Sequence, residues 1–433
     1  GALTHFGKIA STGGSHPYYV PTLKGLMSLA ELMPSDPTLR KHLASYVSRF
    51  PQAVPEDRRN EFAYLTGRYF HEQLNVEKAV RMLEAVSRQS DYWPRARYIL
   101  AITHVANYDA KPAAAAFKEL LRYLMQRRQE TGSLDEESEK LLELARMGLA
   151  RVFYSTGSYE TSLKYYGKIE RGTQRWPQAL FESSWAHFQV DQYNQALGNL
   201  HSLNSPFFAD SYFPEGPILS AVIYFYNCKY DRVRDELENF EYTYQRLKEP
   251  MTQVLEDHEQ ATKLFGWYER LRDEKVNLGP RVMRIFRAAV DDREVRSTVQ
   301  LVGMIREEID KIESMPSSWK SSKLGQSLLQ EASLAESYAV DDAGSLIKQR
   351  LQRVIDNLND LINQKKKILF EVARAEKGQI EDAIKAGMRV GENVEKIEEV
   401  EASADEMYFE FNGEYWRDEI GHYVFNVGSE CKR

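Results

Sequence analysis

ARVFYSTGSYETSLKYY (150–166) returns 34 residues later as SWAHFQVDQYNQALGNL (184–200). In both copies a small residue stands at the first and thirteenth positions and a large residue at the seventeenth. Residues 67–83 and 101–117 share this pattern and are also 34 residues apart. A fixed period of this length indicates stacked helix-turn-helix units, so the sequence predicts an all-α solenoid.

Each predicted unit has a small residue where its first helix crosses its second helix, and another in the second helix. The first role falls to Gly67, Ala101, Ala150, Ser184 and Ala221, and the second role to Ala79, Ala113, Ser162, Ala196 and Val233. The first-role residues are separated by 34, 49, 34 and 37 positions, so two junctions hold extra residues. The surplus fits 126–140, a charged stretch expected to be an exposed loop with helical extensions, and 205–216, which is rich in proline and aromatic residues.

Aromatic-proline pairs support this register independently. Trp93-Pro94, Trp176-Pro177 and Phe213-Pro214 each begin eight residues before a first-role residue. Proline is tolerated in the first turn of a helix, where its missing N–H would have no intrahelical partner. These pairs therefore predict the starts of three first helices.

Residues 157–162 and 192–196 resemble the turn and second helix of the tetratricopeptide repeat (TPR) family, and the resemblance covers residues 60–245. It implies a superhelix whose inner face, formed by the first helices, takes up an extended or helical segment of a protein partner. The predicted groove residues are Tyr64, Arg68, His71, Tyr98, Met147, Arg151, Tyr154, Phe181, Trp185, Phe188, Val222 and Phe225. The alternative is that many of these side chains are core between helices.

Beyond residue 250 the period ends and the chain becomes charged and helix-favouring. Gly279-Pro280 and 316–318 divide it into three stretches, of which the third has an apolar seam at heptad spacing, with Lys365 within it. The seam residues are Ile347, Leu351, Val354, Leu358, Leu361, Ile368 and Val372. We expect 281–312 to fold back on this helix as an antiparallel hairpin or coiled coil. Because that arm is shorter, either 252–278 or another chain would cover the rest.

The C-terminal segment has a different composition. Residues 407–427 combine seven aromatic side chains with two glycines, whereas a disordered tail would be poor in aromatics. We expect this tail to dock on its own chain, with a partner protein as the alternative. Together with the repeats and the coil, it resembles TPR proteins of gliding and predatory bacteria, which implies a cell-envelope or motility setting.

Composition argues against several other functions. The net charge of -7 provides no basic field for nucleic acid, and no apolar run is long enough to cross a bilayer. The nine histidines form no metal-binding motif, and no phosphate-binding loop or nucleophile elbow is present. We therefore expect no metal, no cofactor and no enzymatic activity.

The start of the sequence lacks the pattern of a signal peptide, so the protein is either cytoplasmic or has lost a signal, and a periplasmic or outer-membrane-associated location is favoured. Cys228 and Cys431 are the only cysteines, and their spacing alone does not decide whether they pair.

The sequence thus predicts four regions: a helical cap (1–58), a TPR-like solenoid (59–249), a long helical hairpin (250–405) and an aromatic tail (406–433). The predicted function is a scaffold that binds a protein segment in the groove. The alternative is an envelope spacer that self-associates through its coiled coil.

Overall fold

The computed structural model describes residues 2–13, 15–32, 37–385 and 414–431. All regular elements in these ranges are helices, which confirms the predicted all-α fold. The chain divides into two compact units, Gly1–Val190 and Asp191–Arg433. This division falls inside the predicted solenoid (59–249), and the predicted hairpin and tail belong to the second unit together with the last repeat helices.

The first unit begins with three helices in the predicted cap region. These are α1 (Ala2–Thr12), α2 (Tyr19–Leu32) and α3 (Pro37–Ala44), followed by the 3-10 turns η1 (Val47–Arg49) and η2 (Glu56–Arg58). Leu23, Leu26 and Leu39 are fully buried and belong to the same apolar core as Phe62 of the first repeat. The cap therefore closes the N-terminal end of the repeat stack, as terminal repeats of solenoids do.

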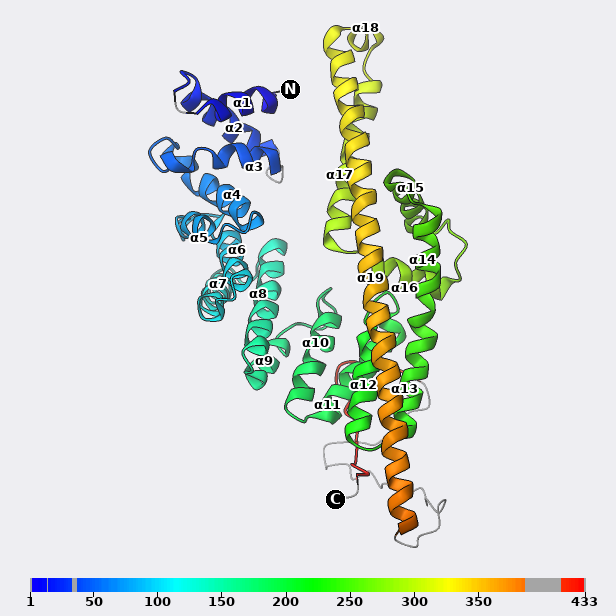
Figure 1. Ribbon diagram of the computed structural model, residues 1–433. Coiled ribbons are helices and arrows are strands. Elements are labelled where there is room, and N and C mark those ends of the chain that lie inside the picture. The colour runs from blue at the N-terminus through cyan, green and yellow to red at the C-terminus, as the bar shows by residue number, and fades with distance from the viewer. Residues whose placement is uncertain (1, 14, 33–36, 386–413, 432–433) are drawn as a thin grey trace. The chain divides into compact units, whose positions relative to one another are not determined.

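Paired helices make up the rest of the first unit. They are α4 (Arg59–Glu72) with α5 (Val76–Glu84), α6 (Trp93–Ala106) with α7 (Ala110–Thr131), α8 (Glu136–Ser155) with α9 (Tyr159–Tyr166), and finally α10 (Trp176–Gln189). Each helix packs on the next in chain order (Figure 1). First helices also touch the next first helix, α4 with α6 and α6 with α8, whereas α5 and α7 are not in comparable contact. The first helices therefore lie closer to one another than the second helices do.

The small residues lie where the sequence predicts. A Cβ added to Gly67 would lie 2.7 Å from the Cγ atom of Leu83, so the two helices of that pair can approach only because the side chain is absent. Ala79 and Ala113 are fully buried, and the Ser162 hydroxyl donates a hydrogen bond to the Ala150 carbonyl oxygen over 2.7 Å. The predicted crossing points are confirmed.

A left-handed residue marks the turn inside every repeat. These residues are Leu74, Tyr108, Gly157, Asp191 and Cys228, each with φ between 55° and 75°. Their separations are 34, 49, 34 and 37 positions, the same intervals as those between the first-role residues. In four of these turns, the residue that follows the left-handed residue donates its backbone N–H to the carbonyl oxygen five positions earlier. Examples are Asn75 to Phe70 (2.9 Å) and Lys229 to Tyr224 (3.0 Å). This is the Schellman ending of a helix, repeated at each turn.

The insertion at 126–140 is mostly helical extension rather than loop. Helix α7 runs to Thr131 and ends at Gly132, whose φ is 80°. Helix α8 begins after Asp135, whose side chain caps it by accepting a hydrogen bond from the Ser138 amide over 2.9 Å. Three residues, 132–134, lie between the end of α7 and this cap; 132 and 133 are exposed, and Leu134 packs against the core of the first unit.

The second unit is arranged around one long helix. Its elements are α11 (Tyr193–Leu203), η3 (Pro206–Phe208), α12 (Glu215–Tyr226), α13 (Tyr230–Thr243), η4 (Gln245–Leu247), α14 (Lys248–Asp257), α15 (Ala261–Arg272), α16 (Pro280–Val290), α17 (Arg293–Glu313), α18 (Ser317–Lys320) and α19 (Lys323–Lys385). Helix α19 has 63 residues, which corresponds to about 95 Å at 1.5 Å per residue. It packs against every α-helix from α12 to α18 (Figure 1).

The predicted antiparallel hairpin is confirmed for α17 and α19. Arg306 of α17 pairs with Glu336 near the start of α19, and Arg350 farther along α19 lies 3.6 Å from Asp292 at the start of α17. Helices α14 and α15, which hold most of 252–278, also pack on α19, as do α12, α13 and α16. Residues 386–405 of the predicted hairpin and 406–413 of the predicted tail lie outside the described residues.

The heptad seam of α19 faces this core. Ile347, Leu351, Val354, Leu358, Leu361 and Val372 are at most 3 % exposed, and Ile368 is half-buried. Lys365, the polar member of the seam, forms an ion pair with Glu241 of α13. Its neighbours Lys366 and Lys367 are exposed.

Candidate functional site

The predicted groove residues divide into three groups in the structure. Tyr64 and Met147 are 8 % and 1 % exposed and belong to apolar cores. Their assignment to a binding groove is wrong, because a side chain packed on all sides cannot touch a partner. Val222 and Phe225 are half-buried on α12, in the second unit. The remaining eight lie on first helices of the first unit, and we call them the first-helix face: Arg68, His71, Tyr98, Arg151, Tyr154, Phe181, Trp185 and Phe188.

Helix α10 carries the aromatic part of the first-helix face. Phe181, Trp185 and Phe188 are spaced by four and three positions and therefore share one side of the helix. All three are half-buried, and the rings of Trp185 and Phe188 meet edge to face with centroids 6.2 Å apart. The opposite side buries small residues, among them Ala179 (2 % exposed) and Ala186 (fully buried). Large rings on the more accessible side reverse the usual distribution of apolar side chains in a helix.

An ion pair links α8 to α10 beside these rings. Arg151 donates two hydrogen bonds to the carboxylate of Glu182, over 2.8 and 2.7 Å, and the Tyr166 hydroxyl donates a third over 2.9 Å. The hydrogen bonds to Glu182 raise the pKa of Arg151, and burial raises that of Tyr166 above its ordinary range. Half of the Arg151 side chain remains exposed, so the pair both fixes α10 relative to α8 and stays accessible.

The N-terminal part of the face is polar. Arg68 and Arg40 both bind the carboxylate of Glu72, over distances between 2.7 and 3.1 Å. The Nδ1 atom of His71 lies 2.9 Å from the Thr103 hydroxyl, and burial lowers the pKa of this histidine. The face therefore changes from paired charges on α4 to aromatic rings on α8 and α10, which flank the Arg151–Glu182 pair.

A second site has no counterpart among the predicted site residues. In the second unit, residues 420–431 run along α11 and reach the turn between α12 and α13, and we call this segment the strap. Three rings of the C-terminal segment surround His201 of α11: Tyr415 stacks on it at 4.8 Å, and Tyr423 and Phe425 meet it edge-on at 4.9 and 5.4 Å. Burial lowers the pKa of His201 to about 4, so the imidazole is neutral near pH 7. Docking of the tail on its own chain is thus what the structure shows for residues 414–431.

The strap ends in a covalent link. Cys431 forms a disulfide with Cys228, the left-handed residue of the turn between α12 and α13. Next to it Lys229 pairs with Glu430 over 3.0 Å. The pair of cysteines and the aromatic tail were visible in the sequence, but no signal there connects the tail to α11.

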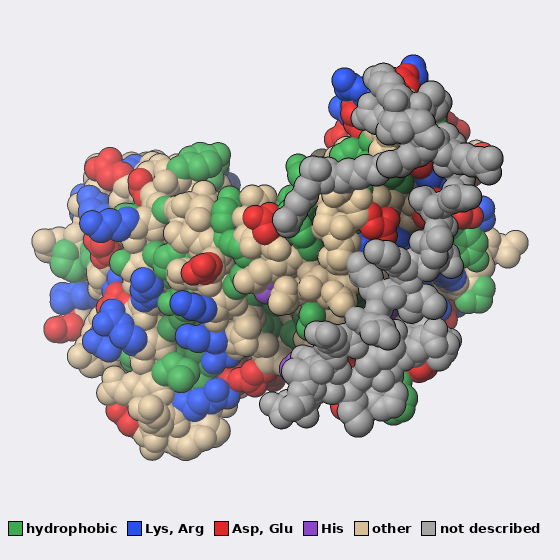
Figure 2. Space-filling view, turned by 90° about the horizontal axis from the view of Figure 1, so that it is seen from below, with side chains coloured by type: hydrophobic (Ala, Val, Ile, Leu, Met, Phe, Trp, Pro, Cys, Tyr) green, Lys and Arg blue, Asp and Glu red, His purple; other side chains and the backbone are tan. Residues whose placement is uncertain are grey.

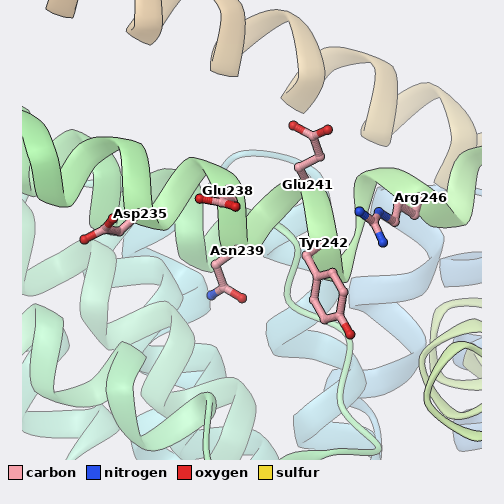
Figure 3. Close-up of a pocket in the computed structure, with 6 residues that line it drawn as sticks. All are labelled: Asp235, Glu238, Asn239, Glu241, Tyr242 and Arg246. Carbon is pink, nitrogen blue, oxygen red and sulfur yellow. The ribbon is translucent and has the colours of Figure 1, made fainter.

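A shallow hollow of about 550 Å³ lies along α13 (Figure 3). It is lined by Asp235, Glu238, Asn239, Glu241, Tyr242 and Arg246. The Tyr242 ring lies beneath two guanidinium groups, those of Arg246 at 5.0 Å and Arg281 at 4.7 Å. Since one helix and the 3-10 turn after it supply the whole lining, the hollow is an open surface feature without convergent catalytic groups.

Among the described residues, the distribution of charge, groups of metal-binding side chains and membrane-spanning helices give no further candidate site. On the face seen in Figure 2, basic and acidic side chains of the described residues are interspersed. Within the described ranges, no three or more His, Cys, Asp or Glu side chains come together in a way that could hold a metal ion. No described helix is both long enough and apolar enough to cross a membrane.

No family model and no curated protein matches the chain. Among solved structures, the chain is similar to the nearly identical TPR-like repeats of a Podosopora anserina protein described as a kinesin light chain. The two are 14 % identical, the match covers 43 % of this chain and 95 % of the other, and the TM-score is 0.33. The fold assignment therefore stands on the chain's own geometry, namely helix pairs with a left-handed turn at the intervals of the sequence repeat. This geometry is that of a TPR-like helical-repeat protein with a long antiparallel helical hairpin.

Proposed function

We propose that the protein is a non-enzymatic scaffold that binds a segment of a protein partner on the first-helix face. The observation that carries this proposal is the placement of Phe181, Trp185 and Phe188 on the more accessible side of α10. An aromatic ring already held by its neighbours loses little conformational freedom on binding, and tryptophan and tyrosine are enriched among residues that dominate interface energies. Burying the remaining exposed ring area contributes about 25 cal/mol per Å².

The ion pair between Arg151 and Glu182 supports this role. It holds α8 and α10 together, so that Tyr154 and the α10 rings form one preorganised surface. A preorganised surface binds more tightly because less ordering is required when the partner arrives. The polar part around Arg68 and His71 would then set the orientation of the bound segment.

The test compares two aromatic truncations. Trp185→Ala removes the central ring of the face, whereas Tyr108→Ala removes a ring that is 96 % exposed at a turn. Proteins crosslinked to each variant in the source cell are quantified by mass spectrometry, with thermal unfolding as the control for folding. We expect recovery of specific partners to fall at least about tenfold for Trp185→Ala only. Equal recovery from wild type and Trp185→Ala would refute the proposal.

We further propose that the protein works in an oxidising compartment, within a bacterial cell-envelope or motility complex. The pairing of Cys228 with Cys431 supports such a compartment, since structural disulfides persist mainly outside the cytoplasm. Alkylation of cell extracts under acid quench, followed by mass spectrometry, measures the oxidised fraction. A mostly reduced pair in living cells would argue against this location.

A spacer or oligomerisation function is favoured by one other observation. The seam of α19 is buried within the chain, but Leu324, Leu334 and Tyr338 on the same helix are 55 % to 70 % exposed. Self-association would use this part of the hairpin. Sedimentation velocity of the full chain and of Leu334→Ser/Tyr338→Ser tests it, because loss of an oligomer in the double variant would support the spacer function.

A further inference from the structure

The strap binds α11 mainly through its backbone. The Gly421 amide donates to the Ser202 hydroxyl over 2.9 Å, the Phe425 amide to the Asn194 carbonyl oxygen over 3.1 Å and the Val427 amide to the Asn194 side chain over 2.9 Å. Farther along, the Glu430 amide donates to the carbonyl oxygen of Asn227 over 3.0 Å. Gly421 lies in a turn, with φ 82°, and the other three donors follow in the irregular segment 423–431. Backbone donors do not depend on the side chain, so these contacts recognise the course of the backbone rather than a particular sequence.

Side chains of the strap add an alternating pattern. Tyr423 and Phe425 both meet His201, whereas Val424 between them is 62 % exposed. Alternate residues of an extended chain point to the same side. Residues 423–425 therefore lie along α11 as an extended segment with aromatic side chains two positions apart, and Ile420, in the turn that precedes them, is only 3 % exposed.

Gly198 makes this close approach possible. A Cβ at position 198 would lie 1.6 Å from the carbonyl oxygen of Tyr423, so any other residue would collide with the strap backbone. Glycine is unfavourable in the middle of a helix, and α11 keeps it at the point where the strap crosses. The helix surface is therefore shaped to receive a peptide backbone.

The disulfide sits at an accessible position of the repeat. At the equivalent turns Leu74 is 75 % and Tyr108 is 96 % exposed, which shows that the side chain at this position points outward. Cys228 and Cys431 are only half-buried. Accessible disulfides are the ones that external thiols can reduce.

We propose that α11 carries a binding site for an extended peptide with aromatic residues at alternate positions, occupied by the strap and closed by the Cys228–Cys431 disulfide. A dithiol opens it. One thiolate of the dithiol attacks a cysteine sulfur and displaces the other cysteine as a thiolate, and the second thiol releases the mixed disulfide. The disulfide gains two electrons and two protons, and the dithiol becomes a disulfide. The strap then competes with a partner segment of the same pattern.

The experiment separates the site from its tethered occupant. The full chain carrying Tyr423→Ala, Phe425→Ala and Cys431→Ser keeps α11 intact but has a weakened strap. A fluorescent synthetic peptide of residues 414–431, with serine in place of its cysteine, is titrated into this variant and binding is followed by anisotropy. We expect saturable binding to the variant, and at least tenfold weaker binding to oxidised wild type.

Two matched glycine variants locate the binding surface. Adding Gly198→Ala to the weakened-strap chain should reduce peptide affinity at least tenfold, because the new Cβ meets the peptide backbone. Gly266→Ala is the control, since it lies within α15 of the same unit and its added Cβ meets nothing within 4 Å. Circular dichroism checks that both variants fold.

The outcomes are distinct. Binding that requires the weakened strap and Gly198 supports the proposal. No binding to the weakened-strap chain, or equal binding with Gly198→Ala, overturns it. Disulfide-linked dimers on reoxidation of reduced wild type would also overturn it, since the occupant would then be the strap of a second copy.

Discussion

Helix pairs α6/α7 and α12/α13 have the same turn but different neighbours. The first pair lies between α5 and α8, so repeats cover both of its sides. The second pair packs on α11 and on α19, a helix that belongs to no repeat. Arg234 and Glu241 of α13 pair with Glu376 and Lys365 of α19, which runs antiparallel to it. The repeat array therefore ends where α19 supplies the surface that a further repeat would otherwise provide, which is the role of a cap.

Removal of a core side chain from α19 should give the largest effect. Leu361 is 2 % exposed and lies one turn before Lys365. Leu361→Ala should lower the free energy of unfolding of the second unit by about 2 to 5 kcal/mol, since it leaves a cavity. Urea unfolding with hydrogen exchange resolved by peptide measures this, and amides of α13 should exchange faster.

Two controls sharpen this result. Leu334→Ala, at a position 55 % exposed on the same helix, should change stability little. Leu100→Ala in α6, where the side chain is 2 % exposed, should speed exchange in the first unit. If Leu361→Ala leaves α13 protected, α19 does not act as a cap for the pair.

A buried carboxylate distinguishes α13 from the second helices of the first unit. Three residues beyond the second-role residue, α5 has Met82 and α7 has Ala116, both buried, whereas α13 has Glu236. Glu236 as a whole is half-buried, but its Oε2 atom is fully buried and has no hydrogen-bond partner among the described residues. Burial, reinforced by Asp235, raises its pKa from 4.5 to about 7.

The raised pKa of Glu236 makes the stability of the second unit depend on pH. Between about pH 4.5 and 7 the folded state holds a proton that the unfolded state has released, so this group lowers stability as pH rises. Glu236→Gln should therefore stabilise the second unit at pH 8, by about 1 to 3 kcal/mol, with little change at pH 4. Thermal unfolding across this range checks it, with the exposed Glu238→Gln as the control. An equal effect of both variants at pH 8 would contradict the assignment.

Substitutions in the repeat turns should have the smallest effect on stability, and they test whether the turns are equivalent. Tyr108 has φ 61° and Gly157, at the same place in the next repeat, has φ 75°. Tyr108→Gly should stabilise the first unit by about 1 kcal/mol, because side chains are strained in this conformation, and Gly157→Ala should destabilise it by a similar amount. Chemical denaturation measures both. The same sign for the two changes would show that the turns differ in strain.

The sequence predicted features that depend on local periodicity. Gly67, Ala79 and Ser162 marked helix crossings because only small residues fit there, and the heptad seam of α19 identified its buried face. Periodicity does not say which element covers a face. The helices that cover the seam of α19, and the burial of Met147, depended on contacts between distant segments and could not be read from spacing.

The strap site could not be predicted from the sequence, for a related reason. Its recognition elements are backbone amides, which every residue except proline has, and a glycine whose role appears only once Tyr423 lies against it. The aromatic composition of the tail predicted docking, but Asn194 and His201 carry no pattern that identifies them as its contacts.

The disulfide also changes the covalent connectivity of the molecule. Cys228 and Cys431 are 203 positions apart in sequence, so their bond closes a ring that includes α13 to α19. A single backbone cleavage anywhere between Lys229 and Glu430 opens this ring without separating the pieces. The cleaved protein would keep its full mass on a non-reducing gel and would yield two fragments only after reduction.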